Sequence, residues 1–185
     1  FRSIPIYATA TTHEGINRNY CMTEKLVTSV RFVEKDVTFK FCGFNITPFE
    51  VPHDGTDNVG YHIEVGGTVF CFVTDLGHIT EKVSSYIEKA NYLILEANYD
   101  EEMLKGGHYP KFLKERITSP LGHLSNKTTA KFLAEHITED LKYVWLCHLS
   151  GENNHPELAY KTVEYELRGV GVIPGVDVHV AALKR

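Results

Sequence analysis

Residues 61–77 read YHIEVGGTVFCFVTDLG, and this stretch predicts a β-hairpin that ends in a polar turn. Residues 61–65 alternate apolar and polar side chains, and residues 68–74 continue as a largely apolar run. The Gly66-Gly67 pair between them is typical of a primed turn, because such turns need positive φ angles. Asp75 follows the second strand directly and is the first candidate for a functional side chain.

Further strands and helices are predicted on both sides of this hairpin. Apolar, β-branched runs predict strands over residues 4–8, 26–34, 37–41, 44–51, 92–95, 143–147 and 176–182. Helical periodicity begins at Ile79 and recurs over residues 126–137, with Ser125 as N-cap, and over residues 156–167. Hairpins come first and strand–helix units second, which predicts a layered α/β (α+β) domain.

Composition excludes several classes of protein. The 185 residues are 43% hydrophobic and 23% charged, unlike a disordered or fibrous chain, and contain no apolar run long enough to cross a membrane. A net charge of −5 argues against a protein that coats nucleic acid, but not against a nuclease whose metal ions supply positive charge. The four cysteines lack CxxC spacing, which favours reduced thiols and a cytoplasmic protein.

Three potential metal ligands follow the ends of three different predicted strands. His53 follows the strand over 44–51, Asp75 the strand over 68–74, and His148 the strand over 143–147. Two imidazoles and one carboxylate suit zinc, manganese or iron. Each residue alone has an ordinary explanation as a loop or cap residue. Their recurrence at the same structural position predicts a metal site.

The other histidines need sorting, since the chain has ten. His123 lies just before the helix that starts at Asn126, where backbone N–H groups attract anions, so its imidazole could give a proton to a leaving oxygen. His62 is expected on the solvated side of its strand. Ordinary structural or surface roles are expected for the remaining ones: His13, His78, His108, His136, His155 and His179.

Several of these motifs, in this order, resemble the metallo-β-lactamase superfamily, and within it the YycJ (WalJ) branch of bacterial nuclease-like hydrolases. The motifs are PHD at 52–54, GY at 60–61, TDLG at 74–77, LEAN at 95–98, GHLSN at 122–126 and HLSGENN at 148–154. Short matches at 109–110, 113–114 and 116–117 belong to the same set. The resemblance runs from about residue 4 to residue 182 and implies an αββα sandwich with a dinuclear metal centre at one edge.

The resemblance also implies roles for individual residues. His53 and His148 correspond to metal ligands, and Asp75 to the carboxylate that bridges two metals, zinc or manganese. His123 corresponds to the general acid of phosphodiesterase members, and Glu96 to the acidic residue that orients it. Asn126, Ser125 and the adjoining helix start are expected to help hold phosphate. The implied substrate is nucleic acid, DNA more than RNA, degraded from the 5′ end.

The superfamily motif His-x-His-x-Asp-His is absent, and its nearest counterpart is Thr12-His13-Glu14. Tyr99 also stands where the family pattern has a histidine. The chain is therefore expected to be one metallo-β-lactamase-like domain over residues 1–185, incomplete at its N-terminus and the C-terminal portion of a longer protein. It would hold one metal or none, be inactive alone, and self-associate through uncovered sheet surface. The alternatives are a hydrolase of a small ester, thioester, lactam or cyclic phosphodiester, and a non-catalytic interaction module.

Overall fold

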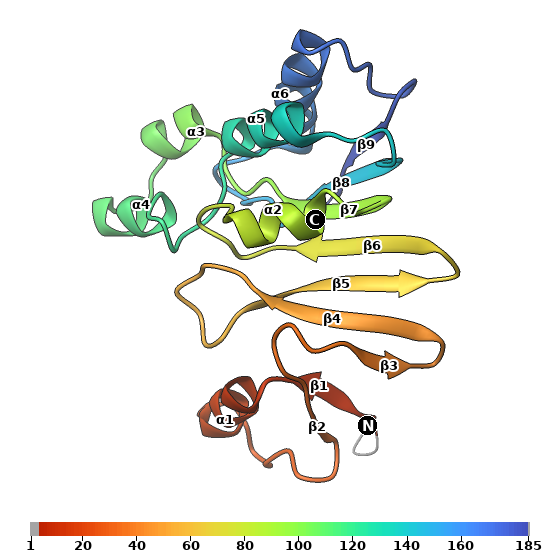
Figure 1. The fold of residues 1–185 in the computed structure, drawn as a ribbon. Coiled ribbons are helices and arrows are strands. Elements are labelled where there is room, and N and C mark those ends of the chain that lie inside the picture. Colours follow the sequence, from red (N-terminus) through yellow and green to blue (C-terminus); the bar gives the residue numbers. More distant parts are fainter. Residues whose placement is uncertain (1–3, 185) are drawn as a thin grey trace.

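A mixed sheet of seven strands organises the computed structural model, which describes residues 4–184 (Figure 1). Its strands, in spatial order, are β3 (Phe39–Phe41), β4 (Phe44–Glu50), β5 (Val59–Val65), β6 (Thr68–Val73), β7 (Tyr92–Glu96), β8 (Tyr143–Cys147) and β9 (His179–Ala182). Neighbours from β3 to β6 are antiparallel, and those from β6 to β9 are parallel. The predicted order of hairpins followed by strand–helix units is confirmed.

The β5–β6 hairpin forms where the glycine pair predicts it. Val65 pairs with Thr68, and Gly66 and Gly67 occupy the turn with φ angles of 56° and 78°. These left-handed angles cost glycine little, since it has no Cβ. The hairpin therefore sets the register that brings Asp75 to the end of the sheet.

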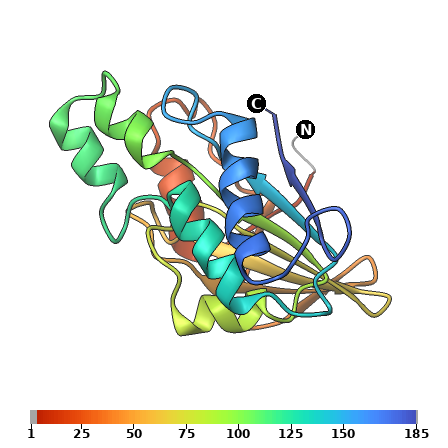
Figure 2. The ribbon, with the colours of Figure 1, turned by 90° about the horizontal axis from the view of Figure 1, so that it is seen from above.

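Three helices cover one face of the sheet: α2 (Glu81–Ile87), α5 (Asn126–His136) and α6 (Pro156–Gly169) (Figure 2). Their apolar sides pack with the alternate strand residues in one buried core, which includes Val83, Leu133, Val163, Leu95 and Leu146. The predicted helices over 126–137 and 156–167 are confirmed, as is the Ser125 N-cap, whose hydroxyl accepts from the Thr128 N–H.

The opposite face of the sheet is lined by aromatic side chains that are only partly buried. Phe70 stacks on Tyr92, with 4.9 Å between ring centroids, and Tyr143 stacks on Trp145 at 4.5 Å. Phe72, on the same face by strand alternation, is 41% exposed. This aromatic face of the sheet is therefore only partly covered, and the self-association expected from the sequence stays a prediction.

The N-terminal region differs more from the prediction. β1 (Ile6–Ala8) pairs in parallel with β2 (Val30–Phe32), which is shorter than the predicted strand over 26–34. Between them lies α1 (Ala10–Arg18), a helix that the sequence analysis missed. Two short helices before α5, α3 (Glu101–Gly106) and α4 (Lys111–Ile117), were also missed. Each of the three buries at most one side chain, so none carries the apolar stripe that periodicity detects.

The prediction for His62 is wrong, because its side chain is buried and packs against Tyr86 of α2. The helices cover the face that carries His62, whereas Tyr61 and Ile63 lie on the half-exposed face. His13 is likewise buried, and its Nε2 lies 3.2 Å from the Arg31 carbonyl oxygen. All four cysteines are free, but Cys21 and Cys42 are exposed. Among residues 4–184, no helix has the length and apolar character that crossing a membrane requires.

Candidate metal centre

The three predicted ligands come together at one end of the sheet. Strands β4, β6 and β8 point the same way, since β5 is antiparallel to both β4 and β6 while β6, β7 and β8 are parallel. His53, Asp75 and His148 follow these three strands at their carboxyl ends. Such ends are where α/β sheets build their sites.

The backbone holds two of these residues in a conformation that side chains rarely adopt. Asp75 has φ of 54° and His148 has φ of 55°. A left-handed angle at a residue other than glycine is strained, and such strain concentrates at functional sites. The turns after β6 and β8 thus hold Asp75 and His148 in strained backbone conformations, and the rest of the fold offsets this strain.

Both imidazoles turn Nε2 toward the same carboxylate. His53 Nε2 and His148 Nε2 each lie 3.7 Å from Asp75 Oδ1. The Nδ1 of His53 donates to the Gly122 carbonyl at 2.9 Å, and the Nδ1 of His148 donates to Glu96 Oε1, also at 2.9 Å. Metal-binding histidines are oriented in this way, with the second ring nitrogen bonded to a carbonyl or carboxylate.

The separation of each histidine from Asp75 fits a shared divalent metal. Atoms bonded to one ion at about 2.0–2.2 Å lie roughly 3–4 Å apart, which matches the separations from Asp75. Two groups of ligand atoms lie within 4.8 Å of one another: His53 with Asp75 and His123, and Glu96 with His123 and His148. Asp75 belongs to the first group and Glu96 to the second, while Asp75 Oδ1 lies 3.7 Å from Nε2 of both His53 and His148. Imidazole and carboxylate donors suit zinc, manganese and iron alike.

Glu96, the last residue of β7, contacts two histidines of the site. Its side chain is fully buried, and Oε1 accepts from His123 Nδ1 at 2.6 Å as well as from His148. Oε2 accepts from the Leu76 N–H at 3.0 Å. Burial raises the pKa of Glu96, but the hydrogen bonds from His123 and His148 outweigh it and leave this pKa below its ordinary value. The hydrogen bond between His148 and Glu96 also raises the pKa of His148, although the burial of His148 acts to lower it.

His123 lies in the loop between α4 and α5. Its ring centroid lies 4.9 Å from that of His53 and 5.2 Å from that of His148. A Cβ on Gly122 would collide with the Ile117 carbonyl, and one on Gly77 with the Pro120 carbonyl. Only glycine allows this close approach, which brings His123 over Glu96 and the Gly122 carbonyl onto His53.

Ser125 and Asn126 lie beside the site but have internal partners. Asn126 is 1% exposed, and its amide exchanges two hydrogen bonds with Asn154. The Ser125 hydroxyl donates to Glu101 Oε1 at 3.0 Å while it caps α5. The phosphate contact predicted for them stays a prediction, and both side chains hold the His123 loop in place.

Two features of the site escaped the sequence analysis. The Arg116 side chain, from α4, pairs with Asp54 through Nε and through an NH2–Oδ1 contact of 2.9 Å. This guanidinium lowers the pKa of Asp54. The second feature is the Gly122 carbonyl, for which sequence carries no signal. By contrast, Asp54 and Arg116 both lie within matched motifs, so their pairing had a signal that was not used.

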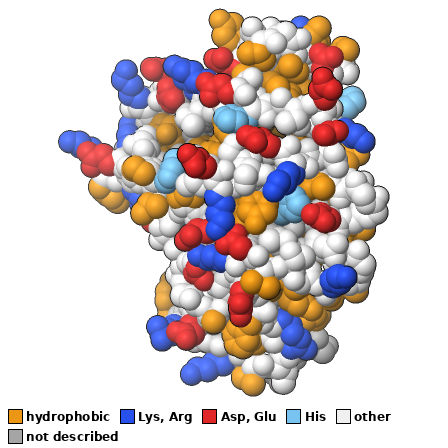
Figure 3. Space-filling view, in the orientation of Figure 1, with side chains coloured by type: hydrophobic (Ala, Val, Ile, Leu, Met, Phe, Trp, Pro, Cys, Tyr) orange, Lys and Arg blue, Asp and Glu red, His pale blue; other side chains and the backbone are white. Residues whose placement is uncertain are grey.

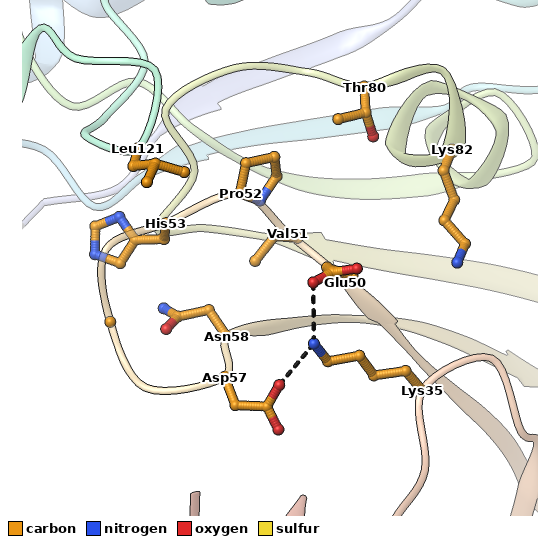
Figure 4. Close-up of a pocket in the computed structure, with 11 residues that line it drawn as sticks. Lys35, Glu50, Val51, Pro52, His53, Asp57, Asn58, Thr80, Lys82 and Leu121 are labelled. Carbon is orange, nitrogen blue, oxygen red and sulfur yellow. Dashed lines mark hydrogen bonds and ion pairs between the residues drawn. The ribbon is translucent and has the colours of Figure 1, made fainter. Parts of the chain in front are cut away.

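Cavities flank the histidines. One, of about 420 Å³, is lined by His53 and by Lys35, whose ammonium lies between Glu50 and Asp57 (Figure 4). Another, of about 570 Å³, is lined by His123, His148 and residues of α4. The site is thus open on both sides.

Sequence comparison now places this geometry in a family. The profile described as "Beta-lactamase superfamily domain" matches residues 1–144. The chain belongs to the β-lactamase superfamily. Within it, the chain is 32% identical to "Exodeoxyribonuclease YycJ" of Bacillus anthracis over 181 residues, 95% of this chain and 67% of that protein. It is 31% identical to "Exodeoxyribonuclease WalJ" of Streptococcus pneumoniae over 175 residues, 95% of this chain and 65% of that protein.

Solved structures confirm the fold of the superfamily. The metallo-β-lactamase fold protein YhfI from Bacillus subtilis matches with a TM-score of 0.69 at 17% identity, covering 100% of this chain and 63% of that one. Zn²⁺-bound PqqB from Methylobacterium extorquens matches with a TM-score of 0.60 at 21% identity, covering 96% of this chain and 60% of that one. The expected YycJ-like membership and metallo-β-lactamase fold are therefore confirmed. The chain spans about two thirds of the length of its curated relatives.

Proposed function

We propose that this protein is a metal-dependent phosphodiesterase that degrades DNA from the 5′ end. The observation that carries the proposal is the buried Glu96 carboxylate, which is hydrogen-bonded both to a candidate metal ligand, His148, and to a candidate proton donor, His123. The Glu96 carboxylate thereby orients both the histidine that would bind the metal and the histidine that would donate the proton. The names of the two relatives, both exodeoxyribonucleases, support a DNA substrate.

His53, Asp75 and His148 would hold the metal, zinc or manganese. When bound, such an ion lowers the pKa of a water molecule and neutralises charge on the phosphate. His53 and His148 present Nε2 because their Nδ1 atoms are already bonded to Gly122 and Glu96. Asp75, 38% exposed, supplies the negative charge between them.

His123 acts as the general acid in this proposal. Its Nδ1 donates to Glu96, which leaves Nε2 to carry the proton for the departing oxygen. The Glu96 carboxylate stabilises the charged imidazolium and fixes its tautomer. Since Glu96 is fully buried, it contacts substrate only through these histidines.

The surface offers no broad positive region on the face seen in Figure 3, where acidic and basic side chains are interspersed. Attraction of a nucleic acid on this face would depend on the metal centre rather than on net charge, which is −5. The free cysteines support a reducing compartment, and we place the protein in the cytoplasm as part of this proposal.

The test measures hydrolysis of 5′- and 3′-labelled DNA oligonucleotides by the full-length gene product, with whatever residues it carries beyond these 185. A chelator should abolish activity, and zinc or manganese should restore it. His123→Ala should lower kcat by roughly 10²- to 10⁴-fold and leave metal content unchanged. His136→Ala is the matched control, because His136 is a surface residue paired with Glu88.

Either of two results would overturn the proposal: activity that survives complete metal removal, or undiminished turnover by His123→Ala. Elemental analysis of the 185-residue chain tests the ligand count separately. Three ligands predict at most one weakly held metal. Two tightly held metals would mean that residues other than His53, Asp75 and His148 complete the centre.

A further inference from the structure

The cavity of about 570 Å³ beside His123 and His148 has an aromatic and aliphatic wall. The segment that carries α4 supplies Tyr109, Leu113 and Ile117 to this lining, and the loop after β8 supplies Leu149, beside polar side chains that include Asn98 and Ser150. Its volume lies within the range of about 300–1,000 Å³ typical of small-ligand sites. The cavity thus joins an apolar surface to the proposed proton donor and one proposed metal ligand.

The segment that carries Tyr109 is held in place by polar contacts of two α4 side chains, Lys114 and Arg116. The Lys114 ammonium donates to the Lys105 carbonyl at 2.8 Å and to the Gly107 carbonyl at 2.7 Å, which fixes the turn between α3 and α4. Two residues further along α4, Arg116 pairs with Asp54, the neighbour of His53. Tyr109 is therefore positioned relative to the metal ligands rather than free to swing away.

We propose that this cavity is a nucleoside subsite, in which the base of the nucleotide next to the scissile phosphate stacks on Tyr109. The inference rests on the proposed function, since it needs a phosphodiester at His53, Asp75 and His148. A phosphate there leaves its attached nucleoside facing the cavity that His123 and His148 line. A flat base matches the Tyr109 ring, which lines the cavity together with Leu113 and Ile117, and every base has a face that can stack. The subsite therefore accepts all four bases.

The test is a double-mutant cycle in which the Tyr109 ring and the DNA base are removed separately and together. The full-length gene product is assayed on a DNA oligonucleotide and on the same oligonucleotide with an abasic residue next to the cleaved bond. For the unaltered enzyme, loss of the base should lower kcat/KM by roughly 5- to 150-fold, the range of one stacked base. Tyr109→Ala should lower kcat/KM for the normal oligonucleotide by a similar factor, yet should be nearly insensitive to the abasic residue.

Matched variants separate stacking from damage to the fold. Tyr109→Phe keeps the ring and should retain the sensitivity to the base, whereas Tyr109→Leu keeps apolar bulk and should lose most of it. Tyr165→Ala removes an exposed tyrosine from α6 and should behave as the unaltered enzyme. If Tyr109→Ala does not fold, as shown by loss of its thermal unfolding transition, the sensitivities of Tyr109→Phe and Tyr109→Leu to loss of the base decide whether Tyr109 stacks on it.

A binding measurement gives a readout that does not depend on turnover. In the His123→Ala background, an oligonucleotide with 2-aminopurine at the same position should show quenched fluorescence on binding. Adding Tyr109→Ala should relieve the quenching. If the abasic residue lowers kcat/KM by the same factor in the unaltered enzyme and in Tyr109→Ala, the subsite is wrong and the proposed function still stands. Absence of any DNA hydrolysis by the unaltered full-length enzyme would overturn the proposed function first.

Discussion

Glu96 is a fully buried carboxylate that accepts three hydrogen bonds, from His123, His148 and the Leu76 N–H. A glutamine of the same shape offers one oxygen where Glu96 offers two. Its NH₂ group would face either the Leu76 N–H or the two imidazoles, so that a buried donor loses its acceptor. Leaving such a group unpaired costs about 1–3 kcal/mol.

Glu96→Gln should therefore lower the free energy of unfolding by about 1–3 kcal/mol and weaken metal affinity by roughly 10- to 100-fold. Urea unfolding and calorimetric metal titration measure the two effects. Glu88→Gln is the control, because Glu88 also pairs with a histidine, His136, but at the surface. That change should stay within about 0.5 kcal/mol. Equal metal affinity in Glu96→Gln and the parent would contradict the orienting role of Glu96.

Asp57 gives a prediction about pH. Its carboxylate pairs with the Lys35 ammonium at 2.6 Å. The hydrogen bonds that it accepts from Lys35 and Thr9 hold the pKa of Asp57 below its ordinary value. A depressed carboxyl pKa stabilises the fold above the pKa of the unfolded state, about 3.9, and this contribution is lost as pH falls through the folded pKa.

Asp57→Asn should thus lower the free energy of unfolding by on the order of 1 kcal/mol at pH 7, because the pair is partly exposed. The difference from the parent should persist down to about pH 5 and shrink as the pH falls below about 4. Urea unfolding at pH 7, 5 and 3 follows it. A difference that stays constant over this range would show that the Asp57 charge is not its source.

At the scale of elements, the loop between α4 and α5 does more than connect two helices. The Gly122 carbonyl orients His53, and the next residue is His123. A Cβ on Gly122 would meet the carbonyls of Arg116 and Ile117, which are backbone atoms that cannot move aside alone. The loop would have to shift, and both histidines would shift with it.

Gly122→Ala should accordingly destabilise the protein by about 1–3 kcal/mol and reduce metal affinity. Gly106→Ala, at the end of α3, is the matched control, because nothing lies within 4 Å of its added Cβ. It should leave metal affinity unchanged. Chemical denaturation and metal titration compare the two variants, and equal metal affinity in both would refute the role assigned to the loop.

Elements with a strong apolar pattern could be predicted from sequence, and so could the positions of the candidate site residues that follow them. The strand over 143–147 and the helix over 156–167 have clear periodicity, and His148 falls between them. Helix α4 buries no side chain, and Lys114 anchors it instead through bonds to two backbone carbonyls, which sequence alone does not locate. For His62, alternation separates the two faces of β5 but does not say which one the helices cover.

For the whole molecule, the sheet is the layer that carries both the site and an unpaired aromatic face. Helices α2, α5 and α6 cover one face of the sheet (Figure 2), and the candidate metal centre lies at one of its ends. On the opposite face, Phe70, Tyr92 and Trp145 form a continuous row, with centroid separations of 4.9 Å and 6.0 Å. Contiguous apolar surface of this kind promotes association.

The 185-residue chain should therefore self-associate with rising concentration, and Phe72→Lys should suppress this. Phe72 is 41% exposed on β6, so a lysine there reaches water while it places charge on the apolar face. Tyr165→Lys, on the exposed side of α6, is the control and should leave association unchanged. Sedimentation velocity over a concentration series measures the effect. If Phe72→Lys and the parent sediment alike at every concentration, association does not involve this face, and another exposed surface must drive any self-association that is observed.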